Sequence, residues 1–372
     1  DLNKASPTRV VALAPHNNVR AAVMGASRAA PTATEMKAMH EIVAAWLEAG
    51  AVGMATGLDY LPGRFASTDE VVELCERVAE SGGVYATHMR LLDAGRDGAW
   101  REAAEIGRRA GTGVRIAHER LDEIAMALLD ETSAVADMTL DSYLYPAGCT
   151  SLAFHVPAEL LTAGVTTLAE LLSTEPGIAD GLAEHLESRL TGGLDKEVIV
   201  AGTTSGAHEG ETLKAMAEQR RKTVGEVAVE LLRDEMPCAV LIYAWQRPDV
   251  SWDAIMRRTL GDSRTMIASD GVYLGSKAHP RGFGTFPRVL GALSRDKDLV
   301  DLATAVHKMT GKPAAAYGLL DRGRVEPGLK ADLVVFDPNT VDGPADYDEP
   351  RQRPVGISAV LIGGARREEK AV

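Results

Sequence analysis

The sequence predicts an α/β protein built on a parallel sheet, with a helical insertion before the last strand and a small β unit at the end. Three patterns support this fold class. Short apolar runs alternate with helical patterns through the first 150 residues, which is typical of strands that are each followed by a covering helix. The alternation stops near residue 151 and resumes near residue 254. From about residue 319, hairpin-like strands replace it.

Composition and charge favour a globular protein that acts on small molecules. At 372 residues, 45% of them hydrophobic, the chain is long enough for two or three units with a large core. The formal net charge of −13 disfavours nucleic acid and anionic membranes as partners, because both attract clustered Lys and Arg. The sequence has no apolar run of roughly 20 residues and no signal pattern in its first residues. Three widely spaced cysteines without a CxxC pair fit a reducing compartment, so we expect a cytoplasmic protein.

Five strands with helices between them are expected in the first part of the chain. The helix after residue 32 begins with a capping-box pattern, Thr32-Ala-Thr-Glu35, and Gly50 marks its end. Ser67-Thr-Asp-Glu70 repeats the start signal, and Cys75 falls on the apolar face of the helix that follows, which predicts a buried packing residue. The expected strands lie near residues 10–14, 52–56, 84–87, 114–117 and 138–143.

The sequence of the second half of the chain predicts three further parts of the structure. Polar helices, a glycine-rich stretch at residues 201–210 and a strand-like run at 239–245 indicate an insertion near the mouth of the sheet. The sheet resumes at residues 265–271, and residues 302–309 predict a covering helix. The expected domains are a first barrel part at 1–150, an insertion or lid at 151–253, the last barrel strand and helix at 254–318, and a small β unit at 319–372.

Two histidines follow two expected strands at the same position, in Tyr85-Ala-Thr-His88 and Arg115-Ile-Ala-His118. In a βα barrel the strand ends build the active face, so this repeat aims two imidazoles at one point. Neutral imidazole is the commonest metal ligand in proteins. Asp270 ends a third strand before Gly271, where a carboxylate can take a proton from metal-bound water and pass it to a leaving nitrogen.

The alternative for each histidine is a hydrogen-bonded core residue, which the strand-end repeat makes less favoured. The other histidines are expected to be surface or packing residues, because three lie in helical patterns and two lie in the insertion. His16 follows the first strand and is a candidate for lining the cavity. The five expected surface or packing histidines are His40, His185, His307, His155 and His208.

These motifs resemble those of the N-acyl-D-amino-acid deacylases, or D-aminoacylases, of the amidohydrolase superfamily. The resemblance covers nearly the whole chain, and the run His279-Pro-Arg-Gly-Phe-Gly-Thr-Phe-Pro-Arg-Val-Leu290 is specific to this branch. It implies a (β/α)8 TIM-type barrel that carries zinc, a small β-sandwich beside it and a mobile insertion over the active site. The other segments that carry the resemblance are residues 85–90, 117–120, 269–271, 308–310 and 321–323.

The resemblance also implies roles for individual residues. His88 and His118 fall on metal ligands for zinc, with one or two ions, and Asp270 falls on the catalytic acid and base. The implied substrate is a small N-acyl amino acid whose carboxylate is bound by Arg281, although a loop-stabilising ion pair is the alternative for that arginine. The other implied substrate-binding residues are Arg120, Tyr60, Tyr143 and Cys149. Arg120 stands for a family lysine and Cys149 for a serine, which leaves the fine substrate preference open.

Two motifs of the family do not occur in this chain: a first strand ending in His-x-His and a second strand with a cysteine ligand. We therefore expect a barrel that is incomplete at its N-terminal end, with only part of the β-sandwich. We also expect a second polypeptide that supplies the missing strands and metal ligands, because open strand edges pair with other chains. Two alternatives remain: a metal-free, non-catalytic binding subunit, or another amidohydrolase that acts on a cyclic amide or a dipeptide.

Overall fold

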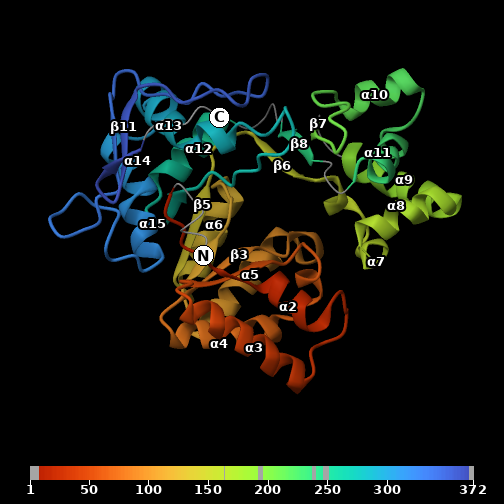
Figure 1. Cartoon of the computed structure of the whole chain (residues 1–372), viewed down its shortest axis with the longest axis horizontal. Helices are drawn as coiled ribbons and strands as arrows, with labels where there is room; N and C mark the ends of the chain where they lie inside the picture. Colours follow the sequence, from red (N-terminus) through yellow and green to blue (C-terminus); the bar gives the residue numbers. More distant parts are fainter. Residues whose placement is uncertain (1–7, 163, 192–195, 237–239, 246–250, 368–372) are drawn as a thin grey trace.

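A six-stranded, wholly parallel sheet forms the core of the computed structural model, which describes residues 8–162, 164–191, 196–236, 240–245 and 251–367. The strands lie in the order β1-β2-β3-β4-β5-β9, and helices lie in the connections between consecutive strands (Figure 1). The predicted parallel α/β fold is confirmed. The strands are β1 (Ala14–Pro15), β2 (Gly53–Gly57), β3 (Val84–His88), β4 (Val114–Ile116), β5 (Met138–Ser142) and β9 (Thr265–Ile267).

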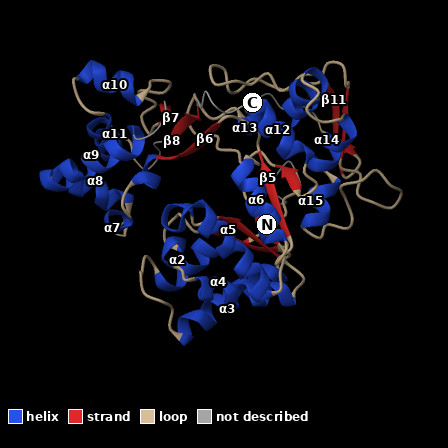
Figure 2. Ribbon diagram, turned by 180° about the vertical axis from the view of Figure 1, so that it is seen from behind, coloured by secondary structure: helices blue, strands red, loops and turns tan. Residues whose placement is uncertain are grey.

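Helices pack against this parallel sheet (Figure 2). Together they bury the largest side chains of the core. Trp100 and Leu74 from the helices and Tyr85 and Leu140 from the strands are fully buried in one cluster. Burial of this kind supplies roughly 1.5–3 kcal/mol for each large apolar side chain. The helices of this part are α2 (His16–Met24), α3 (Ala33–Glu48), α4 (Thr68–Glu80), α5 (Leu91–Ala110) and α6 (Glu123–Ser133).

The predicted helix starts are confirmed, with one difference at Glu70. Thr32 and Glu35 form the complete capping box of α3. At α4, Ser67 accepts the Glu70 N–H as predicted, but the Glu70 side chain turns into the core and pairs with Arg20. Cys75 is fully buried, as expected.

The first strand is shorter than predicted. The sequence favours a strand at residues 10–14, whereas β1 consists of Ala14 and Pro15 alone. Among the described residues β1 has one strand neighbour, β2, and Val11 is 39% exposed. A strand at the edge of a sheet has hydrogen bonds on one side only, which explains the short regular segment.

A three-stranded sheet accompanies the helices predicted for residues 151–253, and its first strand begins at Ala147, before the predicted start of the insertion. Strands β6 (Ala147–Ser151), β8 (Val240–Trp245) and β7 (Lys196–Gly202) pair antiparallel in that order. Leu168, Leu186, Met216, Val227 and Leu232 are buried in a second hydrophobic core within this part. Its helices are η2 (Leu152–His155), α7 (Ala158–Leu161), α8 (Val165–Thr174), α9 (Pro176–Thr191), α10 (Leu213–Arg220) and α11 (Val224–Asp234) (Figure 1).

One close backbone contact joins the insertion to the loop after β9. Gly275 has φ 76°, and a Cβ atom there would lie 2.1 Å from the carbonyl oxygen of Ala201. The same oxygen accepts the N–H of Lys277 at 3.2 Å. On the other side of the contact, Glu209 accepts the N–H of Ser276 at 2.7 Å. Only a residue without a side chain fits at position 275.

The chain then returns to the parallel sheet and ends in a small antiparallel sheet. The helix predicted at residues 302–309 is confirmed as α14. Strands β10, β11 and β12 pair in that order. In the described residues, no helix combines the length and the apolar character that crossing a membrane requires. The elements of this part are α12 (Trp252–Gly261), α13 (Arg281–Arg288), η3 (Val289–Asp296), α14 (Leu302–Met309), α15 (Gly311–Ala316), β10 (Leu333–Phe336), β11 (Ile357–Ile362) and β12 (Ala365–Arg366).

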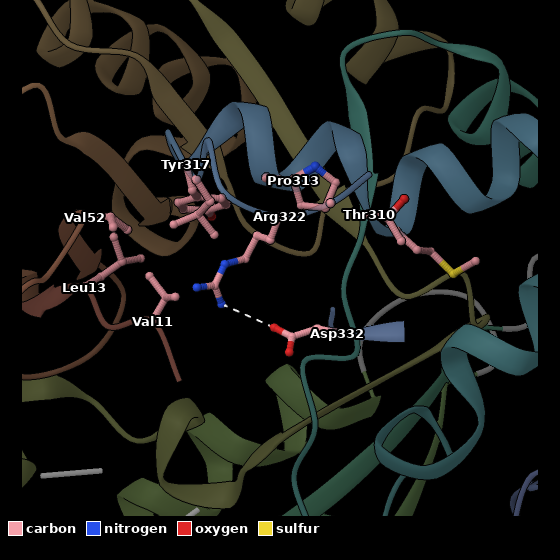
Figure 3. A pocket seen from close by; sticks show the side chains of 12 residues that line it. Val11, Leu13, Val52, Thr310, Pro313, Tyr317, Arg322 and Asp332 are labelled. Atoms are coloured by element: carbon pink, nitrogen blue, oxygen red, sulfur yellow. Dashed lines mark ion pairs between the residues drawn. The ribbon is translucent and has the colours of Figure 1, made fainter. Parts of the chain in front are cut away.

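A cavity of about 490 Å³ separates the segment before β1 from the helices that follow β9 (Figure 3). Val11 and Leu13 line one wall, Pro313 and Tyr317 line the other, and Arg322 extends into the space. Within the described part of the chain, β1 and β9 each pair with a single strand. The six parallel strands therefore form an open sheet rather than a closed barrel.

Lys308 of α14 is buried beneath β9. Its burial predicts that the stability of the fold depends on pH. Its ammonium donates to the Thr265 hydroxyl at 2.7 Å and to the carbonyl of Asp262. Burial lowers the pKa of Lys308 to about 8. Between pH 8 and the ordinary lysine range the unfolded chain therefore holds the proton that the folded chain releases, and the free energy of unfolding should rise with pH.

Lys308→Met removes the charge and keeps the length of the side chain. Relative to this variant, the wild type should gain on the order of 1–3 kcal/mol of stability between pH 8 and 10, measured by urea unfolding. If the free energy of unfolding changes with pH in the same way in the wild type and in the variant, Lys308 is not the group that titrates.

Candidate active site

His88 and His118 meet at the carboxyl ends of β3 and β4. His88 is the last residue of β3, and His118 follows the last residue of β4 by two positions. Nδ1 of His88 lies 2.8 Å from Nε2 of His118, and the ring centroids are 4.8 Å apart. The structure thus brings together the two side chains that the strand-end pattern predicts to converge. Their role as metal ligands stays a prediction.

An unusual backbone conformation aims the His118 ring into the site. Its φ of 46° lies in the left-handed region, and its N–H donates to Oδ1 of Asp141 at 2.8 Å. Burial, together with the neighbouring His88 and Arg281, lowers the pKa of His118 to about 3. The ring is therefore neutral near pH 7 and has a nitrogen lone pair available for a ligand.

A buried carboxylate that the sequence analysis did not select lies on the other side of His88. Oδ2 of Asp59 is 3.1 Å from Nε2 of His88, and Oδ1 of Asp59 accepts the N–H of Leu92 at 2.9 Å. Asp59 follows the end of β2 by two residues and precedes the predicted site residue Tyr60. The sequence signal that could have identified Asp59 is its position just after a strand end, because the two predicted histidines occupy comparable positions.

Two facing imidazole nitrogens suit two positions around a zinc ion. Histidine nitrogens are common zinc ligands, so Nδ1 of His88 and Nε2 of His118 would hold one ion together. Among the described residues, no group of three or more His, Cys, Asp or Glu forms a candidate metal site. A catalytic zinc takes three protein ligands. The donor chemistry of His88 and His118 fits zinc, but this part of the chain supplies two donors rather than a complete set.

Asp270 stands three residues after β9, in a left-handed backbone conformation with φ 45°. Its Oδ2 lies 2.9 Å from a terminal nitrogen of Arg281, and its side chain is 38% exposed. Partial burial raises the pKa of Asp270, while the charges of Arg281, His88 and Arg120 act in the opposite direction. A carboxylate whose pKa is raised is a stronger base once ionised, which suits proton transfer.

Two arginines and a tyrosine form the cationic wall of the site, which consists of Arg281, Arg120 and Tyr143. The guanidinium carbons of Arg281 and Arg120 lie 4.4 Å and 4.8 Å from the centre of the Tyr143 ring. Arg120 also donates to the Tyr143 hydroxyl at 2.7 Å. The Nε atoms of both arginines are buried without a hydrogen-bond partner among the described residues. The structure therefore places Arg281 both in an ion pair with Asp270 and in a wall that can receive an anion.

Cys149 takes part in this wall through its backbone. Its carbonyl oxygen is 3.5 Å from a terminal nitrogen of Arg281, which is a weak hydrogen bond. Burial raises the pKa of the Cys149 thiol to about 11, so the side chain is a neutral thiol near pH 7.

Aromatic rings cover the imidazole pair. The Tyr60 ring lies 4.8 Å from the His88 ring, and Phe154 of η2 lies 5.2 Å from Tyr60 and 6.2 Å from His88. Tyr60 was predicted at the site and Phe154 was not. Phe154 reaches the site from the insertion, and its sequence has no local feature that places it beside β3.

His279 is a further site residue that was not predicted from the sequence, after Asp59 and Phe154. It is fully buried, its Nδ1 accepts the N–H of Arg281 at 3.0 Å, and its Nε2 lies 3.0 Å from the carbonyl of Ala147. The ring packs edge-on against Tyr143 and Tyr145, and burial lowers its pKa to about 3. A neutral His279 thus orients the start of α13 and the arginine that begins it.

His16 does not line the cavity. It is fully buried, with Nε2 3.1 Å from a carboxylate oxygen of Glu70, so it belongs to the ionic core beneath α2. His40 and His208 lie on the surface beside Glu73 and Glu211, and Nε2 of His185 donates to the carbonyl oxygen of His155.

Comparison with known proteins places this geometry in a family. The profile of the amidohydrolase family matches residues 1–367. The D-aminoacylase of Alcaligenes xylosoxydans xylosoxydans is 34% identical over 98% of this chain and 68% of its own length. The N-acyl-D-glutamate deacylase of the same organism is 32% identical over 95% of this chain and 66% of its own length.

Solved structures agree with these matches. A crystal structure of D-aminoacylase superposes with a TM-score of 0.74 at 35% identity, covering 94% of this chain and 66% of the other. The N-acyl-D-glutamate deacylase of Bordetella bronchiseptica, complexed with zinc and a phosphonate inhibitor, gives a TM-score of 0.78 at 31% identity, covering 98% and 70%. This chain thus spans about two thirds of the length of its relatives. The parallel sheet, the strand-end histidines and these matches confirm the predicted resemblance, and the chain belongs to the amidohydrolase family.

Proposed function

We propose that the protein hydrolyses the amide bond of an N-acyl-D-amino acid or of a similar carboxylate-bearing amide. The observation that carries the proposal is the cationic wall beside the imidazole pair and Asp270. Arg281 is buried and Arg120 is half-buried, and the Nε atoms of both lack a hydrogen-bond partner among the described residues. This favours an anionic ligand, because planar guanidinium binds carboxylate through paired hydrogen bonds. The relatives named D-aminoacylase, N-acyl-D-glutamate deacylase and N-acyl-D-aspartate deacylase support a substrate of this class.

We propose that His88 and His118 hold a divalent metal ion, with zinc as the best candidate. The facing nitrogens and the neutral state of His118 support this role. So do the zinc in the related glutamate deacylase and the binuclear metal centre of D-aminoacylase. A bound ion of this kind acts as a Lewis acid that polarises a carbonyl and acidifies water.

Asp270 is the proposed general base and general acid. Its carboxylate takes a proton from the attacking water and later gives that proton to the departing nitrogen of the amine product. Arg281 pairs with this carboxylate in the present structure, which favours the ionised form. A substrate carboxylate that binds Arg281 competes for this guanidinium, and the basicity of Asp270 then increases.

We further propose that additional polypeptide covers the open edges of the parallel sheet. The support is the single strand neighbour of β1 and of β9 among the described residues, together with the apolar cavity between these edges. The matched relatives are single chains that are longer than this one, so the comparisons give no support to a covering segment on a second polypeptide. That part of the proposal rests on the open edges alone.

A cytoplasmic location is also proposed. Cys75 and Cys149 are free thiols in the structure, and free thiols persist in reducing compartments. Cys238 lies outside the described residues.

Asp270→Asn keeps the shape of the side chain and removes its basicity. We expect turnover of an N-acyl-D-amino acid to fall by ~10²–10⁴-fold while the metal content stays unchanged. Asp253→Asn is a matched control, because Asp253 is an exposed carboxylate that pairs with Lys297. Near-normal turnover in Asp270→Asn would assign the proton transfer to another group.

Arg281→Lys keeps the positive charge and loses the paired donors. KM should rise roughly 10-fold or more for substrates with a free carboxylate and much less for their carboxamides, because the amide does not form the charged pair. Arg101→Lys, at an exposed ion pair with Glu131, is the control. Equal changes in KM for both substrate types would show that Arg281 does not bind the carboxylate.

Native mass spectrometry combined with denaturing mass analysis tests the covering polypeptide. The isolated 39.5 kDa chain should bind Zn²⁺ weakly and hydrolyse poorly, and both properties should improve together in a complex with the covering segment. A fully active monomer of this mass, without a second polypeptide, contradicts the proposal of a separate chain.

A further inference from the structure

Asp59 contacts His88 from the side opposite His118. The Asp59 side chain is completely buried, and its Oδ2 lies 3.1 Å from Nε2 of His88. The other ring nitrogen, Nδ1, faces His118. A carboxylate accepts hydrogen bonds and does not donate them, so Nε2 of a neutral His88 must carry the proton. Nδ1 then keeps its lone pair and points it toward His118.

The second carboxylate oxygen of Asp59 also accepts a hydrogen bond. Oδ1 accepts the N–H of Leu92, which is the second residue of α5. This N–H belongs to the short turn Leu91–Ala94, which the non-helical Gly95 (φ 66°, ψ 173°) separates from the rest of α5, and the Asp59 carboxylate supplies its acceptor. Two donors, one from the backbone of α5 and one from His88, therefore surround a single carboxylate.

Asn17 holds the loop that carries Asp59. Its amide nitrogen donates to the carbonyls of Gly57 and Tyr60, each at 3.1 Å, and its amide oxygen accepts the N–H of Gly57 at 3.1 Å. The packing is close, because a Cβ atom at Gly63 would lie 2.5 Å from the amide oxygen of Asn17. All polar atoms of the Asn17 side chain thus act on residues 57–63.

Asn17 is in turn fixed by the buried ionic core beneath α2. Its neighbour His16 and the nearby Arg20 both contact the Glu70 carboxylate at 3.1 Å, and all three side chains are at most 1% exposed. The Arg20 guanidinium also donates to the carbonyls of Ser27 and Ala29 at 2.9 Å. Because a buried ion pair is costly to break, the first turn of α2 is a rigid support for Asn17.

We infer that Asp59 is a positioning residue for His88: it fixes the Nε2–H tautomer, and Asn17 sets the loop that brings Asp59 to the ring. The inference rests on the proposed function, in which His88 binds a metal ion. With the proton fixed on Nε2, the lone pair of Nδ1 is free to bind that ion. Carboxylates that accept from the second nitrogen of a metal-binding histidine raise metal affinity by typically 10–100-fold.

Asp59→Asn is the decisive variant, because it replaces one of the two acceptor oxygens with an NH₂ donor. If its oxygen keeps the bond from Leu92, its NH₂ group faces Nε2 of His88 and forces the proton to Nδ1. Long-range ¹H–¹⁵N correlation spectra of ¹⁵N-histidine-labelled protein at pH 8 report this tautomer, and His88→Gln identifies the His88 signals. The wild type should show Nε2–H and Asp59→Asn should show Nδ1–H. The affinity for Zn²⁺ alone, measured by calorimetry, should fall by ~10–100-fold.

Asp93→Asn provides the matched control, since Asp93 is an exposed carboxylate in the same first turn of α5 and pairs with Arg64. It should leave the His88 tautomer and the Zn²⁺ affinity unchanged. An Nδ1–H tautomer in the wild type overturns the inference even if the variant does not fold. So does an Asp59→Asn protein with the wild-type tautomer and affinity.

The spectra also separate this inference from the proposed function. A wild type that shows the Nε2–H tautomer but hydrolyses no N-acyl-D-amino acid overturns the proposed function and leaves the role of Asp59 intact. A protein that hydrolyses such a substrate with an Nδ1–H tautomer overturns the role of Asp59 alone.

Discussion

The parallel register of β2, β3 and β4 determines the geometry of the candidate active site. Gly57 pairs with His88, and Thr87 pairs with Ile116, so the three strands end at nearly the same level. Asp59 and His118 each follow a strand end by two residues, and they meet His88 from its two sides. A shift of one residue in either pairing would exchange the faces of a strand and separate these side chains. The register in turn depends on the apolar core, which buries Met54, Tyr85 and Ile116.

Burial divides the charged groups of the site into two classes. The histidines His118 and His279 lose their charge, because burial lowers the pKa of each to about 3. Arg281 and Arg120 remain cationic, because a guanidinium does not release its proton in proteins. The positive charge of the cationic wall therefore comes from two side chains within a protein whose formal net charge is −13. An anionic substrate is attracted locally, not by the overall charge.

Local patterns in the sequence predicted the features that depend on local physics. Alternating strands and helices, the capping box at Thr32 and the strand-end positions of His88, His118 and Asp270 follow from burial periodicity and turn chemistry. Residues whose role requires distant partners were not found. Asp59 needs the register of β2 and β3, and Phe154 needs the packing of the insertion. Glu70 matched a helix-capping pattern, yet its side chain serves Arg20, because that arginine is buried and lacks another carboxylate partner among the described residues.

The glycine contact between the insertion and the loop after β9 has a consequence for how such proteins diverge. Gly202 and Gly275 approach so closely that a Cβ on Gly275 would be 2.3 Å from the Cα of Gly202. Either segment can change its other residues independently, but neither can acquire a side chain at this point without moving its neighbour. A side chain gained at either glycine would therefore displace the other segment, so the two positions are constrained as a pair although 73 residues separate them in the sequence.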